Sequence, residues 1–249
     1  MDLGLKDQVV IVSGGASGIG AAIVESLKAE GAVPVIFDLA DGRGEDFYQI
    51  DLCDDDAVAA AIRSVIDQKQ RIDAIVNNAG VNDGVSLSSG KAAFEASLSK
   101  NLTQCYCLVH HALDPLKQSR GSIVNIGSKV AMTGQGGTSG YAASKGGLLA
   151  LTREWALELA CYGVRSNAVI PAEVWTPMYE RWLHSLEDPA ARKKEIERRI
   201  PLGARMTLPE EIADMVVFLL SKRSLHTTGQ IINVDGGYTH LDRAYISEP

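Results

Sequence analysis

The chain has 249 residues, 46% hydrophobic and 22% charged, which is enough to bury one large core. Its formal net charge of −7 argues against nucleic acid or an anionic membrane as a partner, because either would require a basic surface. No apolar run approaches the roughly 18 residues of a membrane span, and the four cysteines are spaced like neither a disulfide framework nor a zinc site. We therefore expect one cytoplasmic domain over residues 1–249 that acts on a small molecule and holds no metal.

Strand and helix patterns alternate along the whole chain. Short β-branched runs predict seven strands, near residues 8–12, 33–37, 47–50, 74–77, 122–126, 164–170 and 230–234. Apolar residues at helical spacing predict a helix after the first strand and further helices near residues 54–68, 91–116, 141–161 and 209–220. This alternation predicts an α/β fold, a single Rossmann-type doubly wound domain with a seven-stranded parallel sheet. Its ligand should bind at the carboxyl ends of the strands.

The segment near residues 174–200 has a different composition. A dense run of charges follows Pro189, which is placed like the first residue of a helix. We interpret these charges as a solvated helix face. Trp175, Tyr179 and Trp182 give the same segment an apolar side, so we expect it to cover the substrate pocket.

A glycine-rich turn, residues 13–20, joins the first predicted strand to the first helix. Missing side chains let the backbone approach a pyrophosphate, and the helix N-terminus supplies N–H donors. Asp38 follows Gly20 by 18 residues at the end of the second strand, where a carboxylate can bind the ribose 2′-hydroxyl and repel a 2′-phosphate. We therefore predict NAD rather than NADP as the cofactor, although Arg43 nearby could weaken the discrimination.

A second motif carries acid–base chemistry. Tyr141 and Lys145 stand four residues apart and share one helix face. A phenol is a poor base at neutral pH, but an adjacent ammonium group and a positively charged nicotinamide favour the phenolate. Ser128 follows the fifth predicted strand, where its hydroxyl can bond the substrate oxygen. The three side chains are predicted to converge on one carbinol.

Further motifs occur in a fixed order: Asp51 with Leu52, residues 77–80 (Asn-Asn-Ala-Gly), Asn101, and residues 171–176. With the glycine turn and the tyrosine–lysine pair, they make nearly the whole chain resemble the short-chain dehydrogenases/reductases. That resemblance implies hydride transfer between a nicotinamide and a secondary alcohol or its ketone.

The resemblance also implies roles for individual residues. The catalytic residues would be Asn101, Ser128, Tyr141 and Lys145, with Tyr141 as acid/base and Asn101 holding a water for proton relay. The cofactor would be bound by Gly14, Ser17, Gly18, Ile19, Gly20, Asp38, Leu39, Asp51, Leu52, Asn78, Ala79, Gly80, Tyr141, Lys145, Pro171, Val174 and Thr176.

Three departures from the family pattern stand out. Ser13 replaces a threonine and Ala172 replaces the glycine after Pro171, and neither change removes chemistry. Only 13 positions separate Asp38 from Asp51, and the residues between them read as a turn. We therefore expect the family's helix to be absent here and one flank of the adenosine pocket to be open.

The loops that follow the fourth to sixth strands are rich in hydrogen-bonding groups, which suits a polyol better than a steroid or a fatty acyl chain. Candidate substrate-binding residues are Asn82, Ser128, Lys129, Gln135, Tyr141, Glu173 and Trp175. Residues 77–84 with 134–136, and 169–174 with 235–243, are similar to bacterial L-fucose dehydrogenase-like enzymes, which oxidise the anomeric carbon of a sugar to a lactone. This similarity implies an L-fucose-like aldose as the substrate.

Three alternatives remain open. A dehydrogenase of a 2-keto-3-deoxy sugar acid could pair its substrate's carboxylate with Lys129 or Arg243. A 3-oxoacyl-thioester reductase is less compatible with Asp38, because biosynthetic reductases usually draw on NADPH. A cofactor-binding regulator without catalysis is possible on this fold, but the intact catalytic residues argue against it.

Family members commonly associate through their two long helices and their last strand. We therefore expect a homotetramer in which residues 239–243 reach a neighbour's substrate site. Apolar residues available for such contacts are Leu148, Leu149, Leu151, Trp155, Met215, Val216 and Phe218.

Overall fold

The computed structural model describes residues 2–42, 44 and 46–241. Its seven strands are all parallel and stand in the order β3-β2-β1-β4-β5-β6-β7, which confirms the predicted fold. Their bounds agree with the predicted ones to within one residue: β1 (Val9–Ser13), β2 (Val33–Asp38), β3 (Phe47–Gln49), β4 (Ala74–Asn77), β5 (Ser122–Ile126), β6 (Arg165–Pro171) and β7 (Ile231–Val234). The strand order reverses between β1 and β4, and ligands of such sheets bind at this switch point.

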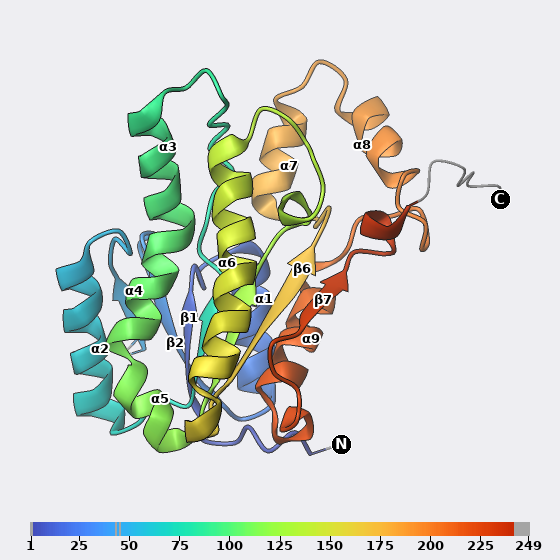
Figure 1. Cartoon of the computed structure of the whole chain (residues 1–249). Helices are drawn as coiled ribbons and strands as arrows, with labels where there is room; N and C mark the ends of the chain where they lie inside the picture. The colour runs from blue at the N-terminus through green and yellow to red at the C-terminus, as the bar shows by residue number, and fades with distance from the viewer. Residues whose placement is uncertain (1, 43, 45, 242–249) are drawn as a thin grey trace.

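Helices cover both faces of the sheet (Figure 1). On one face α1 (Gly18–Ala29) packs against α9 (Pro209–Leu220), and on the other lie α2 (Asp55–Lys69) and α6 (Ser139–Glu158). The central strand β1 is buried along its whole length and contributes alternate residues to the two cores. Burial on both faces explains why its sequence is a continuous apolar run rather than an alternating one.

The helical stretch predicted near residues 91–116 is present, but it is not one continuous α-helix. The structure has α3 (Lys91–Leu98), a π-helical turn (Ser99–Thr103), α4 (Gln104–His111) and α5 (Leu113–Ser119). The break after His111 has a steric cause, because Pro115 has no N–H and its ring would clash with the carbonyl group four residues earlier. The π-helical turn contains Asn101, and such turns are frequent at functional sites.

The connection between β2 and β3 forms no helix in its described residues, as the short spacing predicted. Arg43 and Glu45 lie outside the described part of the chain. β3 has only three residues and pairs with the last three of β2. Leu39 is 70% exposed on this flank, so this edge of the sheet lacks the cover that a helix would give it, as expected for an open flank of the predicted adenosine pocket.

Two short helices follow β6 and stand beyond the carboxyl ends of the strands (Figure 1). α7 (Pro177–His184) and α8 (Pro189–Glu197) each begin with a proline, as predicted for Pro189. The charges of α8 pair along its exposed surface, Arg192 with Glu195 at 2.6 Å among them. The described residues contain no helix long and apolar enough to cross a membrane, and no group of three or more potential metal ligands.

Candidate active site

The glycine turn begins the site at the end of β1. Gly14 and Gly18 have backbone φ values of +67° and +55°, which residues other than glycine rarely adopt. A Cβ on Gly20 would lie 2.0 Å from the carbonyl oxygen of Gly14, so the turn folds directly against the start of α1. The backbone N–H groups at this helix start can therefore approach a phosphate closely.

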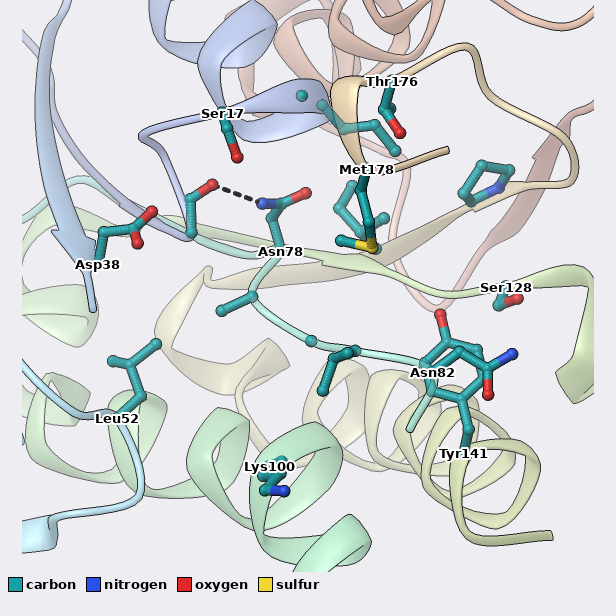
Figure 2. A pocket seen from close by; sticks show the side chains of 18 of the residues that line it. Ser17, Asp38, Leu52, Asn78, Asn82, Lys100, Ser128, Tyr141, Thr176 and Met178 are labelled. Atoms are coloured by element: carbon teal, nitrogen blue, oxygen red, sulfur yellow. Dashed lines mark hydrogen bonds between the residues drawn. The ribbon is translucent and has the colours of Figure 1, made fainter. Parts of the chain in front are cut away.

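The loop after β4 is tied to this turn. The backbone N–H groups of Asn78 and Ala79 donate to Ser13 Oγ at 2.9 and 3.1 Å, so the serine that replaces the family's threonine keeps the hydroxyl's task. Asn78 Nδ2 donates to the carbonyl oxygen of Gly14 at 3.0 Å (Figure 2). Gln104 holds the same loop from α4, because its Nε2 donates to the carbonyl oxygen of Ala79 at 2.7 Å.

Asp38 and the predicted catalytic residues Ser128 and Tyr141 lie at opposite ends of one cavity. The Asp38 carboxylate accepts from the N–H groups of Ala16 at 3.0 Å and Ala40 at 2.9 Å, which fixes it beside the glycine turn. Figure 2 shows Asp38 near Leu52 at one end and Ser128 near Tyr141 at the other. A carboxylate at one end and hydroxyl groups at the other suit the polar groups of a dinucleotide.

At the catalytic end, Tyr141 and Lys145 lie in the first turns of α6. Lys145 is buried; its Nζ donates to the carbonyl oxygen of Ile126 at 2.8 Å and lies 5.7 Å from the centre of the Tyr141 ring. Ser128 follows β5 and lines the same cavity as Tyr141. A phenol hydroxyl, an adjacent ammonium group and a second hydroxyl thus meet at the carboxyl end of the sheet.

Asn101 takes a different position from the other predicted catalytic residues. Its side chain is fully buried in the π-helical turn, where Oδ1 accepts from the N–H of Val81 at 2.7 Å and Nδ2 donates to the carbonyl oxygen of Ser97 at 3.0 Å. The side chain therefore anchors the loop after β4 from behind. The water-holding role that the resemblance implies stays a prediction.

The cavity has a volume of about 650 Å³ and brings together most of the predicted residues. Those that line it are Gly14, Ser17, Gly18, Ile19, Asp38, Leu39, Asp51, Leu52, Asn78, Ala79, Gly80, Asn82, Ser128, Tyr141, Lys145, Pro171, Val174 and Thr176. Gly20, Asn101, Lys129, Gln135, Glu173 and Trp175 do not line it.

Sequence reasoning missed several lining residues, which come from five parts of the chain. They are Ile50, Cys53, Val81, Lys100, Gln104, Ile126, Gly127, Ala172, Pro177 and Met178. Tyr179, which the sequence analysis named as a residue over the pocket, lines it as well. Met178 and Tyr179 belong to the segment predicted to cover the pocket, so that prediction already contained the signal for them. No motif marks Gln104, whose position follows from the packing of α4.

The remaining substrate candidates do not line the cavity. Lys129 and Glu173 form an ion pair in which each side chain is only 13% exposed. Gln135 is exposed in the loop before α6. The centre of the Trp175 ring lies 4.5 Å from Lys193 Nζ. Arg243, the other cation suggested for a carboxylate substrate, lies outside the described residues.

Comparison with known proteins identifies the family. A family model described as enoyl-(acyl carrier protein) reductase matches residues 14–239. The chain is 37% identical to the L-fucose dehydrogenase of Bos taurus, over 92% of this chain and 88% of that one, and 34% identical to the 3-oxoacyl-[acyl-carrier-protein] reductase FabG of Thermotoga maritima, over 94% and 98%. The crystal structure of the Cj0485 dehydrogenase matches with a TM-score of 0.96 and 42% identity, over all of both chains.

The chain belongs to the short-chain dehydrogenase/reductase family. It is an oxidoreductase of that family, which acts on CH–OH groups with a nicotinamide cofactor. The glycine turn, whose backbone N–H groups at the start of α1 can approach a pyrophosphate, and the Asp38 carboxylate beside it fit such a cofactor.

Proposed function

We propose that this enzyme is an NAD-dependent dehydrogenase of a neutral sugar, an L-fucose-like aldose that it oxidises at the anomeric carbon to the lactone. The observation that carries the proposal is that the polar side chains of Asn82, Ser128 and Tyr179 line the same cavity as Tyr141. A sugar requires such partners at each hydroxyl, whereas an acyl chain would leave them unsatisfied. The identity with an L-fucose dehydrogenase supports the same substrate class.

The chemistry follows from the side chains at that end. When bound, the nicotinamide supplies the acceptor for the hydride that leaves the anomeric carbon. Tyr141 Oη, as the phenolate, takes the hydroxyl proton, so the carbon–oxygen single bond becomes the lactone carbonyl. Ser128 holds the substrate oxygen. Lys145 places a positive charge near Tyr141, which stabilises the phenolate before it accepts the proton.

The choice of NAD rests on Asp38. Its carboxylate is held by two backbone N–H groups at the adenosine end of the cavity. There it can accept a hydrogen bond from a ribose hydroxyl, and it would repel a 2′-phosphate. Leu39 and Leu52 beside it offer no charge that would offset this repulsion.

The homotetramer and the cytoplasmic location expected from the sequence remain part of the proposal. Of the apolar residues suggested for subunit contacts, Leu148, Leu149, Trp155 and Val216 are buried within one subunit, whereas Phe218 is 39% exposed. An association through α9 would therefore depend on Phe218 and its neighbours. Light scattering at assay concentration tests the assembly, and a monomer would reject it.

A 3-oxoacyl-thioester reductase is the second candidate, because the chain is 34% identical to FabG of Thermotoga maritima. Initial rates with L- and D-aldoses, sugar acids and 3-oxoacyl thioesters, each with NAD and NADP, separate the candidates. We expect the highest kcat/KM for an aldose with NAD. A preference for an acyl thioester with NADPH would overturn the proposed function.

A further inference from the structure

A polar group of three side chains lies at the substrate end of the cavity. Lys129 comes from the turn after β5, Glu173 from the loop after β6, and Tyr179 from α7. Lys129 Nζ pairs with one Glu173 oxygen, and the Tyr179 hydroxyl donates to the other at 2.8 Å. We call these residues the Lys129–Glu173–Tyr179 group. It joins the segment that covers the site to the loop that carries Ser128.

The three members stand at different depths. Tyr179 lines the cavity itself, whereas Lys129 and Glu173 do not. Both charged residues nevertheless adjoin lining residues, because Lys129 directly follows Ser128 and Glu173 directly precedes Val174. A substrate in the cavity therefore meets Tyr179, and the ion pair acts on it through that side chain.

The hydrogen-bonding capacity of Tyr179 is restricted by Glu173. A phenol has one hydrogen to donate and lone pairs to accept with. Its hydrogen is committed to Glu173, and burial together with the negative charge of Glu173 raises the pKa of Tyr179 well above its ordinary value. The hydroxyl therefore stays protonated at working pH, and towards a ligand it can only accept.

The charge of Lys129 is also committed. Its Nζ pairs with Glu173 and lies 4.4 Å from the centre of the Tyr238 ring, an additional stabilising contact for an ammonium group. The carboxylate group of a sugar acid has acceptors alone, so if it lay against these residues it would find no donor at Tyr179 and no uncompensated charge at Lys129. A neutral sugar can instead donate one of its hydroxyl hydrogens to Tyr179.

We propose that Tyr179 is a specificity-determining residue: held as an obligate acceptor by Glu173, it bonds a hydroxyl of a neutral sugar and selects against sugar acids. Glu173 and Lys129 are positioning residues that act through it. This inference rests on the proposed function, and it excludes the sugar-acid dehydrogenase that the sequence left open.

The first test is Tyr179→Phe, which keeps the ring and removes the acceptor. We expect the KM for the aldose to rise about tenfold while kcat and the KM for NAD stay within twofold of the parent, because the lost bond lies away from the hydride. Tyr48→Phe is the matched control, since it also removes one partly buried hydroxyl bond, 3.2 Å from Ser64 Oγ and away from the cavity. An aldose KM within twofold of the parent in Tyr179→Phe would overturn the proposal.

The second test is Glu173→Gln, which leaves Lys129 without its counter-ion. The single amide oxygen of glutamine then serves as the acceptor for Lys129, and its NH2 group faces Tyr179, so the Tyr179 hydrogen is free. We expect the ratio of kcat/KM for the aldose to kcat/KM for a 2-keto-3-deoxy sugar acid to fall at least tenfold. Adding Lys129→Met to this variant removes the uncompensated charge and should reverse the gain for the sugar acid. An unchanged ratio in Glu173→Gln, with the fold checked by circular dichroism, would refute the inference.

Assays of the parent enzyme distinguish a failure of the proposed function from a failure of the role proposed for Tyr179. If the parent oxidises no aldose, the proposed function fails and this inference fails with it, before any variant is made. If the parent oxidises aldoses and the variants keep its KM and its ratio, the inference alone is wrong.

Discussion

Replacing Asn101 by alanine should damage both stability and catalysis. The buried side chain bridges the π-helical turn and the loop after β4, accepting from Val81 and donating to Ser97. Alanine leaves a backbone N–H and a carbonyl oxygen without these partners, and each buried group so left costs about 1–3 kcal/mol. Because Val81 is partly exposed and its N–H can be hydrated, we expect a total loss of about 2 kcal/mol. In a domain of this size that lowers Tm by roughly 4–8 °C.

The kinetic effect follows from what the bridge holds. Gly80, next to Val81, lines the cavity, and a Cβ on it would lie 2.8 Å from Asn101 Oδ1. A loop freed from Asn101 can move by about 1 Å relative to Tyr141, and a misplacement of that size costs on the order of 100-fold in rate. We expect kcat/KM for the sugar to fall 10- to 100-fold.

Asn167 offers a matched control on β6. Its Nδ2 donates to the carbonyl oxygen of Thr227 at 2.8 Å and its Oδ1 accepts from the N–H of Gln230 at 3.1 Å, so it has the same pattern of two bonds away from the cavity. Asn167→Ala should lose similar stability in thermal unfolding and keep its kcat/KM. Equal kinetic losses in both variants, or none in Asn101→Ala, would refute the reasoning.

Three further predictions concern other parts of the molecule. Tyr141→Phe should reduce kcat at least 1,000-fold while NAD still binds in a fluorescence titration, because the ring stays and the hydroxyl proposed to take the substrate proton is removed; activity within tenfold of the parent would reject the assignment. Asp38→Ser should lower the KM for NADP and raise the KM for NAD in initial-rate assays, and a parent that already prefers NADP would contradict the role of this carboxylate. Glu211 caps α9, and the hydrogen bond from Arg205 and then that from the Leu208 N–H lower its pKa from 4.5 to about 2. Its contribution to stability is therefore full above pH 4.5 and is lost as the pH falls towards 2, so Glu211→Gln should cost about 1 kcal/mol in urea unfolding at pH 7 and less at pH 3.

The parallel strands and most helices were predictable because their signals are local. A strand buried on both faces leaves a short β-branched run, and β1, β4 and β5 are such runs. The region of α3 to α5 was not predictable in detail, because apolar periodicity continues through the breaks. Pro115 was the available sign that α4 must end near His111, whereas the π-helical turn around Asn101 leaves no mark in the periodicity.

Some parts of the site were predictable from the sequence and others were not, for the same reason. The glycine turn lies at the start of one helix, and Tyr141 and Lys145 lie four residues apart in another. Their spacing in the sequence therefore reveals their proximity in space. Gln104 reaches Ala79 from 25 positions away, a contact that depends on how α4 packs. Such partners become visible only when the chain is folded.

Two carboxylates near the cavity illustrate why partners matter more than residue type. Within the described residues, the hydrogen bonds to Asp38 come from backbone N–H groups, so its negative charge remains available to attract a ribose hydroxyl and to repel a phosphate. Glu173 is paired with Lys129, 44 positions earlier in the chain. One carboxylate oxygen accepts from Lys129 and the other from the Tyr179 hydroxyl. The sequence placed both carboxylates near the predicted ligand, but it could not distinguish the two roles that we propose, in which Asp38 acts on the cofactor directly and Glu173 acts on the sugar through Tyr179. Removing Lys129 should therefore change the substrate preference and leave the preference between NAD and NADP unaltered.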